Sequence, residues 1–283
     1  MLYVNNNGKI VPNEGGIFES GNRAYLYGDG LFESIRVIDG EPLNIEAHVL
    51  RMLDGAVALK MRIPTFFSVE FFKNKVKDLV KKSELGGCAR VRISVDRVSG
   101  GTYLPSSNEV QFFIEAYPLA CKAFELNAKG LEVDLYTAQY KQNDFLANFK
   151  TKNGLIYIMA SLTAKEKGLD DMLITSSKGS VLEASSSNIF VVSNGMLYTP
   201  ALEEGCLAGV MRMTLINIAL ESGIKVYECH LLPQNLIAAD EVFLTNAVNG
   251  ITWVGGYRTK RYRNEMAHKL VKLLNEKLLP ERA

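Results

Sequence analysis

Short turn signals divide the N-terminal part of the chain into runs of strand-forming residues. The strongest are Asn-Gly at residues 7–8 and Asp-Gly at residues 39–40, because the two-residue turns that join antiparallel strands need positive φ at their central positions. The runs that flank them cover residues 2–4, 9–11, 31–38 and 41–43. This part of the chain is therefore expected to contain two β-hairpins.

Two helices and two further strands are expected after the second hairpin. Asn44 and Ser68 stand at positions where a side chain can cap the start of a helix. The helices are expected over residues 45–59 and 68–84, and the strands over residues 89–95 and 109–117. This mixture predicts an α+β lobe with an antiparallel sheet over residues 1–117.

The pattern changes after a linker that we expect over residues 118–130, and a second lobe is expected over residues 131–283. No internal repeat or low-complexity tract interrupts it. The expected strands cover residues 131–136, 171–175, 181–184, 189–193, 196–198, 225–230 and 241–244. The expected helices cover residues 153–167, 209–221 and 264–279.

Composition excludes several classes of protein. The 32 basic and 31 acidic residues leave a formal charge of +1, which does not suit a chain whose main partner is a nucleic-acid backbone. With 47% hydrophobic residues the chain is not disordered. No apolar run approaches the roughly 18 residues of a membrane-spanning helix. We therefore expect neither a nucleic-acid partner nor a membrane partner.

The four cysteines and three histidines do not cluster along the chain. No Cys-x-x-Cys pair occurs, so we expect no metal site and four reduced thiols. The N-terminus has no basic region followed by an apolar stretch, which predicts a cytoplasmic protein without a signal peptide. The cysteines are Cys88, Cys121, Cys206 and Cys229.

Three short segments of small and polar residues could carry chemistry. Residues 28–33 precede a strand, residues 183–188 lie between two strands, and residues 207–212 begin a helix. Small residues between strands allow a ligand to approach the backbone. The start of a helix offers free N–H groups to an anion. Each segment alone could also be only a tight turn, a bulge or a helix start.

Together with three further elements, these segments resemble one family. The elements in chain order are Tyr27-Gly-Asp-Gly-Leu-Phe-Glu-Ser-Ile-Arg36, His48-x-x-Arg51, Lys150-x-x-Asn153, Glu183-x-Ser-Ser-Ser-Asn-Ile-Phe190, Gly209-Val-Met-Arg212 and Asp240-Glu-Val-Phe243. They resemble the class IV aminotransferases, which are pyridoxal-phosphate enzymes. The resemblance implies fold type IV: an N-terminal α/β sandwich and a C-terminal β-barrel-like lobe with helices.

The resemblance implies that Lys150 is the catalytic residue and binds pyridoxal 5'-phosphate as a Schiff base. Lys152 is a rival, but Asn153 follows Lys150 at the family's spacing. Glu183 is the implied anion beside the pyridine nitrogen, where a carboxylate keeps the ring protonated. The family's tyrosine five residues after the lysine is absent, because Leu155 stands there.

The resemblance also implies a cup for the cofactor phosphate. Arg51 matches a bidentate phosphate ligand, and we interpret His48, one helical turn earlier, as packing or as a supporting residue. The backbone N–H groups of Val210 and Met211 match the remainder of the cup. Met211 and Ala247 stand where many relatives have threonine, so side-chain contacts should be fewer. The other implied cofactor-binding residues are Ser187, Asn188 and Ala247.

The resemblance also implies a set of substrate-binding residues. Arg90 and Arg92 both lie near the family's carboxylate-binding arginine, and the sequence does not separate them; Arg92 is the one taken into the implied set. The full implied set is Tyr27, Phe32, Ser34, Arg92, Ala247 and Val248.

The resemblance predicts an aminotransferase that exchanges an amino group between a hydrophobic or branched-chain amino acid and a 2-oxo acid. The same motifs occur in two alternatives, a 4-amino-4-deoxychorismate lyase and a D-amino-acid aminotransferase. The family forms homodimers, so a homodimer is expected.

Overall fold

The computed structural model describes residues 2–279. They divide into two compact units, each described by itself below. The first unit contains the residues up to Lys122 together with Phe149–Asn153, and the second contains Ala123–Asn148 and the residues from Gly154 onward. The predicted lobe boundaries, with a linker over residues 118–130, stay a prediction.

The first unit contains a six-stranded antiparallel sheet. Its strand order is β2-β1-β6-β5-β3-β4, so both predicted hairpins, β1–β2 and β3–β4, are present. The strands are β1 Tyr3–Asn6, β2 Lys9–Pro12, β3 Gly30–Ile38, β4 Glu41–Pro42, β5 Ala89–Arg97 and β6 Val110–Pro118.

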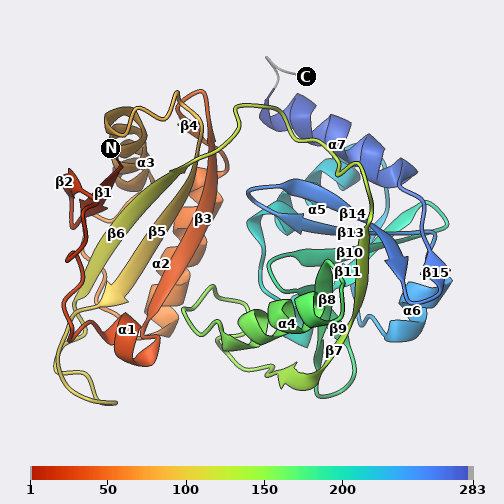
Figure 1. Ribbon diagram of the computed structural model, residues 1–283, viewed down its shortest axis with the longest axis horizontal. Coiled ribbons are helices and arrows are strands. Elements are labelled where there is room, and N and C mark those ends of the chain that lie inside the picture. The colour runs from red at the N-terminus through yellow and green to blue at the C-terminus, as the bar shows by residue number, and fades with distance from the viewer. Residues whose placement is uncertain (1, 280–283) are drawn as a thin grey trace. The chain divides into compact units, whose positions relative to one another are not determined.

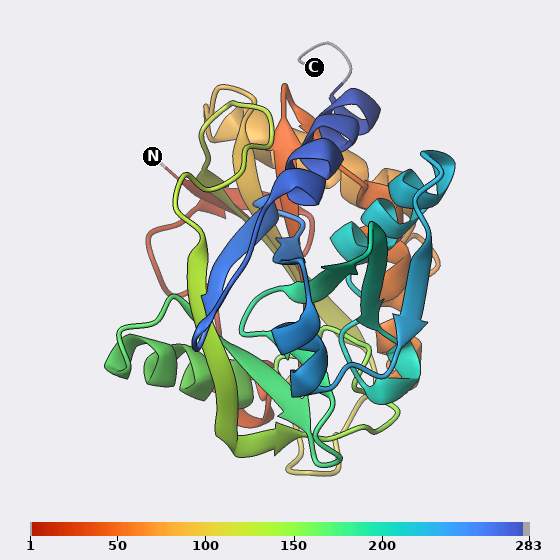
Figure 2. The same ribbon diagram turned by 90° about the vertical axis from the view of Figure 1, so that its right-hand side faces the viewer.

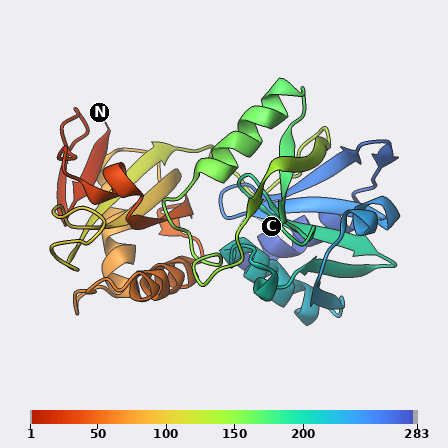
Figure 3. The same ribbon diagram turned by 90° about the horizontal axis from the view of Figure 1, so that it is seen from below.

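Two long helices pack on one face of this sheet. Helix α2, Ile45–Ala58, contacts β3, and helix α3, Val69–Lys82, contacts β6 (Figures 1 and 3). The short helix α1 is Arg23–Tyr27. The core between helices and sheet is aliphatic and aromatic, with Ile35, Val49, Phe72, Leu79 and Ile93 almost completely buried.

The two predicted helix caps have different outcomes. Ser68 accepts a hydrogen bond from the backbone N–H of Phe71, as a side-chain cap should. The predicted capping role of Asn44 is wrong: this residue has a φ of 51° and makes no side-chain cap hydrogen bond. Asparagine tolerates the left-handed conformation. Asn44 therefore allows the backbone to turn sharply into α2, and its side chain does not cap the free N–H groups of the first helical turn.

The second unit is built on a closed barrel. Strands β10, β13, β14, β7, β8 and β9 pair in this order, and β9 returns to pair with β10 (Figure 2). The predicted β-barrel-like lobe is therefore confirmed. The strands are β7 Leu131–Lys141, β8 Asp171–Ser176, β9 Val181–Ala184, β10 Asn188–Ser193, β13 Glu241–Asn246 and β14 Gly250–Tyr257.

The remaining elements extend and cover the barrel. Strands β11, Met196–Pro200, and β12, Val226–Cys229, continue the sheet from β10, and β15, Lys260–Arg261, pairs with β14. The helices are α4 Leu155–Glu166, α5 Val210–Glu221, α6 Pro233–Ala238, α7 Glu265–Leu278 and the short 3-10 helix η1 Leu202–Glu204.

Strand β14 is a central strand of the barrel that no sequence pattern predicted. Its glycines weaken the strand pattern, but Gly255 is needed because its backbone lies against Gly130. A Cβ on Gly130 would come within 2.5 Å of the Gly255 Cα. Close backbone approach thus explains why a strand in this position contains residues that disfavour strands.

One prediction about the cysteines is wrong. Cys88 and Cys121 form a disulfide, with their Cα atoms 5.2 Å apart, while Cys206 and Cys229 are free. The pairing could not be inferred from spacing, because the partners lie 33 residues apart and only the fold brings them together. Separately, none of the helices in residues 2–279 has the length and apolar content needed to traverse a bilayer.

We predict that reduction of the Cys88–Cys121 disulfide lowers the free energy of unfolding by about 2–4 kcal/mol, because the bond restricts the unfolded chain. Urea unfolding with and without a reductant measures the difference. A Cys121→Ser variant is the control and should not respond to the reductant. Recovery of four free thiols from the unreduced, denatured protein would contradict the disulfide.

Candidate active site

Residues 150–152 are held against the start of β3 by backbone hydrogen bonds. The N–H of Phe32 donates to the carbonyl of Lys150 at 3.0 Å, and the N–H of Lys152 donates to the carbonyl of Gly30 at 2.9 Å. Gly28 has a φ of 68°, and a Cβ on it would lie 2.6 Å from the Asn153 side chain. The Gly-Asp-Gly motif is therefore needed for this close approach, which brings Lys150 to Phe32.

The two rival lysines have different surroundings. The ammonium of Lys152 lies 2.5 Å from a carboxylate oxygen of Asp96, which is almost completely buried. The ammonium of Lys150 lies over the Phe32 ring, 4.7 Å from its centroid. Burial raises the pKa of Asp96, and the neighbouring Lys152 opposes that rise. Lys152 thus compensates a buried carboxyl group, whereas the contact described for Lys150 is with an aromatic ring.

The two rival arginines of β5 also differ. The guanidinium carbon of Arg92 lies 3.7 Å from the centroid of the Phe32 ring, whereas that of Arg90 lies 4.9 Å from the centroid of Tyr117. Arg92 is paired across the sheet with Ser34. The structure therefore brings Arg92 together with the predicted residues Phe32 and Ser34, and it places Arg90 beside a different aromatic ring.

Arg51 is held by a buried glutamate that the motif contained but to which no role was given. Its Nε and one terminal nitrogen donate to the two oxygens of Glu33 at 2.8 and 2.5 Å. His48 Nδ1 lies 2.7 Å from the same carboxylate. Burial alone would raise the pKa of Glu33, but Arg51 and His48 outweigh it and lower the pKa to about 2.

His48 is almost completely buried, and its second ring nitrogen points to no partner. Burial lowers the pKa of His48, and this effect is larger than the opposing influence of Glu33. The ring is therefore neutral at pH 7, with the Nδ1 proton on the Glu33 side. Among the described residues, none forms a hydrogen bond with Nε2. A buried nitrogen without a partner is costly unless a ligand satisfies it.

Glu183 lies where the barrel of the second unit closes. It is 2% exposed, and its backbone pairs with Asn188 of β10 and Ile174 of β8. Its Oε1 accepts hydrogen bonds from Lys141 Nζ at 2.6 Å and Tyr157 Oη at 2.8 Å. Its Oε2 accepts one from the N–H of Leu207 at 2.7 Å.

The predicted helix start lies close to Asn188. This side chain donates to the Leu207 carbonyl at 2.8 Å, and a Cβ on Gly209 would collide with it. Helix α5 begins directly afterwards, and no side chain caps it. The N–H groups of Val210 and Met211 belong to the first turn, where an α-helix has no internal acceptors.

The turn after β13 contacts the predicted serine. Asn246 donates to the Ser187 hydroxyl at 3.0 Å and accepts hydrogen bonds from the N–H groups of Val248 and Asn249. The structure thus joins Ser187 to the turn that contains Ala247 and Val248. Sequence reasoning missed Asn246, although asparagine is a common organiser of such turns.

Sequence reasoning also missed two neighbours of Glu183. Lys141 stands at the end of β7 after a break in the strand register, and no local pattern indicated it. Tyr157 lies two residues after Leu155, which is 72% exposed. The family's tyrosine is expected at position 155, so a tyrosine two residues later was a signal that could have pointed to Tyr157.

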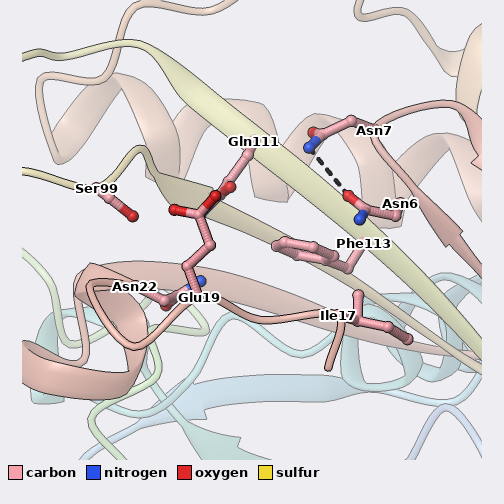
Figure 4. A pocket seen from close by; sticks show the side chains of 8 residues that line it. All are labelled: Asn6, Asn7, Ile17, Glu19, Asn22, Ser99, Gln111 and Phe113. Atoms are coloured by element: carbon pink, nitrogen blue, oxygen red, sulfur yellow. Dashed lines mark hydrogen bonds between the residues drawn. The ribbon is translucent and has the colours of Figure 1, made fainter. Parts of the chain in front are cut away.

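Two pockets of the first unit were compared with the predicted residues. Tyr27 lines a cavity of about 270 Å³ together with Arg23, Arg97 and Tyr103. A smaller polar cavity of about 120 Å³ contains none of the predicted site residues (Figure 4). Its lining residues are Asn6, Asn7, Ile17, Glu19, Asn22, Ser99, Gln111 and Phe113.

Comparison with known proteins defines the family. The profile described as amino-transferase class IV matches residues 30–256. The chain is 28% identical to the branched-chain-amino-acid aminotransferase of Escherichia coli, over 88% of this chain and 83% of that one. It is 29% identical to a candidate enzyme of the same kind from Methanocaldococcus jannaschii, over 98% and 94% of the two chains.

Solved structures agree on the fold. A branched-chain aminotransferase from Thermoproteus uzoniensis superposes with a TM-score of 0.91 at 24% identity, covering 99% of this chain and 95% of that one. A candidate 4-amino-4-deoxychorismate lyase from Legionella pneumophila gives 0.83 at 25% identity, covering 93% and 96%. The chain belongs to the class IV aminotransferase family. The predicted family, fold type and aminotransferase class are confirmed.

We predict that ionised Glu33 stabilises the fold by roughly 3 kcal/mol, which follows from its pKa near 2 against an ordinary 4.5. Because the folded-state pKa is depressed, this contribution is complete above about pH 5 and disappears as the pH falls toward 2. Urea unfolding at pH 7 and pH 3 measures it. Glu33→Gln should flatten the pH dependence, whereas Glu46→Gln, at an exposed position of α2, should not.

Proposed function

We propose that this protein is a pyridoxal-phosphate-dependent aminotransferase that acts on hydrophobic or branched-chain amino acids and 2-oxo acids. The proposal rests most directly on the surroundings of Lys150, whose ammonium lies over Phe32 while the rival Lys152 is committed to Asp96. The named relatives support the substrate class, because branched-chain-amino-acid aminotransferases match across most of both chains.

The residues present fit the cofactor. Glu183 supplies a buried carboxylate for the pyridine nitrogen, and three donors hold it in place. The guanidinium of Arg51 suits a phosphate, as do the first N–H groups of α5. Bound pyridoxal phosphate supplies an electron sink for the substrate Cα. A solved branched-chain aminotransferase from Thermobaculum terrenum is described in its PLP form.

Each proposed residue has a separate task. Lys150 would hold the cofactor covalently, and once the substrate amine has displaced it, its free amine would move the proton at the substrate Cα. Arg92 binds a substrate carboxylate, and Phe32 shields the lysine from water. Ser187, Asn188 and Ala247 support the cofactor, and the remaining substrate contacts are Tyr27, Ser34, Ala247 and Val248.

We predict that the protein loaded with pyridoxal phosphate has the visible absorption band of a lysine-bound cofactor. Lys150→Ala should abolish the band, because the covalent bond cannot form, and Lys152→Ala should keep it. Absorption spectroscopy after removal of unbound cofactor measures both. A band that survives in Lys150→Ala would contradict the assignment of the lysine.

The same preparation tests the reaction. Addition of L-glutamate or L-leucine alone should convert the bound cofactor to pyridoxamine phosphate and release a 2-oxo acid. Pyruvate release from 4-amino-4-deoxychorismate, without conversion by any L-amino acid, would favour the lyase. Conversion of the cofactor by D-amino acids alone would favour a D-amino-acid aminotransferase.

We propose that the protein is a homodimer, as its family resemblance implies. Helix α4 supports this, because it is apolar on both faces: Ala160 and Ala164 are buried, while another face is exposed. Its exposed stripe, called the α4 stripe, contains Leu155, Ile158, Met159 and Leu162 at helical spacing. An exposed apolar patch of this kind marks an interaction surface, and a second copy of this chain is the occupant that we propose.

We predict that Ile158→Asp shifts the protein from dimer to monomer, because it places a charge in the α4 stripe. Light scattering after gel filtration measures the mass. Leu220→Asp on α5 is the matched control. Leu220 is 55% exposed and Ile158 is 53% exposed, but Leu220 lies outside the α4 stripe. A wild-type protein that is monomeric and fully active would contradict the dimer.

The cytoplasmic location stays a prediction. The Cys88–Cys121 disulfide weakens the cysteine argument for it, because disulfides are uncommon in that compartment.

A further inference from the structure

The carboxylate of Glu183 receives three hydrogen bonds, and only one of the three donors is a cation. Lys141 Nζ lies 2.6 Å from Oε1, whereas the hydroxyl of Tyr157 and the N–H of Leu207 are neutral donors. A carboxylate offers about four lone-pair positions. Oε1 accepts two of the donors and Oε2 one, so one position on Oε2 is left for a further donor such as a protonated ring nitrogen.

An irregularity at the end of β7 and a buried environment position Lys141. The register of β7 against β8 breaks between Tyr136 and Lys141, and such irregularities redirect side chains next to functional sites. The side chain of Lys141 is only 10% exposed, and its ammonium also donates to the carbonyl of Ala147 at 3.0 Å. A lysine is rarely buried unless it is paired, and its pairing here is with the carboxylate proposed to meet the cofactor.

A hydrogen bond between a carboxyl group and a pyridine nitrogen can hold its proton at either end. With the proton on nitrogen the pair is a carboxylate and a pyridinium, and with the proton on oxygen both groups are neutral. A cation in direct contact with the carboxylate stabilises the anion more than it destabilises the more distant pyridinium, because charge interactions weaken with distance. Without that cation, burial would favour the neutral carboxyl group.

We propose that Lys141 is a positioning residue that keeps Glu183 ionised and thereby holds the shared proton on the cofactor's ring nitrogen. This inference rests on the proposed function, since it concerns the same cofactor. Tyr157 has the second role at Oε1: it orients the carboxylate but adds no charge, and burial raises its pKa so that the hydroxyl stays neutral.

The experiment separates charge from hydrogen bonding with three variants. Lys141→Gln keeps a donor but removes the charge, Lys141→Arg keeps the charge, and Tyr157→Phe removes a neutral donor. In the cofactor-free proteins, the infrared carbonyl band that disappears on Glu183→Gln reports protonation of this carboxyl group. In the loaded proteins, the chemical shift of a 15N label in the pyridine ring reports its protonation.

We expect Lys141→Gln to strengthen the infrared band of the protonated Glu183 carboxyl group at pH 7, relative to the wild type, and to move the 15N shift toward neutral pyridine at the same pH. Lys141→Arg should match the wild type in both measurements, and Tyr157→Phe should change them much less than Lys141→Gln. A purely structural role would instead leave both measurements unchanged in any variant that folds.

Three results would overturn the inference. The first is a protonated Glu183 in the wild-type, cofactor-free protein at pH 7, a measurement that does not depend on whether any variant folds. The second is an infrared band of Glu183 that is equally strong in Lys141→Gln and Lys141→Arg at pH 7. The third is an equal 15N shift in Tyr157→Phe and Lys141→Gln. None of these affects the proposed function, which fails separately if the wild type forms no lysine-bound cofactor.

Discussion

The pairing of β9 with β10 is the contact on which the second unit depends. It closes the barrel through Glu183 and Asn188, and the same two side chains organise what lies at the closure. Asn188 holds the Leu207 carbonyl ahead of α5, while Glu183 accepts the Leu207 N–H. Strands on both sides fix the backbone of Glu183, and three donors orient its carboxylate. The residue that closes the barrel is therefore also the one that presents the carboxylate.

Glu33 in the first unit and Glu183 in the second are buried carboxylates that are compensated in the same manner. Glu33 meets one permanent cation, Arg51, and a neutral histidine; Glu183 meets one cation, Lys141, and neutral donors. Removing one partner of such a cluster is costly, since a charge is left buried without compensation. The clusters differ in purpose: that of Glu33 orients an arginine suited to phosphate, whereas that of Glu183 holds the carboxylate itself.

Local sequence patterns were sufficient to predict elements whose signal lies within a few consecutive residues. The hairpins at residues 7–8 and 39–40 followed from turn chemistry, and the cap at Ser68 followed from its hydroxyl. Strand β14 was missed because its glycines weaken the local strand pattern, and Gly255 is required by its close contact with the backbone of Gly130. The disulfide was missed for a related reason, since two cysteines 33 residues apart become partners only through the sheet.

By itself, the sequence determined the family and the barrel-like second lobe, because the motifs that identify them depend on residue type and spacing. It favoured Lys150 over Lys152 by the spacing to Asn153, but it did not separate Arg90 from Arg92. The tertiary structure supports Lys150 and Arg92, since Asp96 takes the neighbouring lysine while Arg92 lies against Phe32. It also brought Lys141 to Glu183 across 42 residues. Such pairings arise from strand register and barrel closure, which no local pattern of residues encodes.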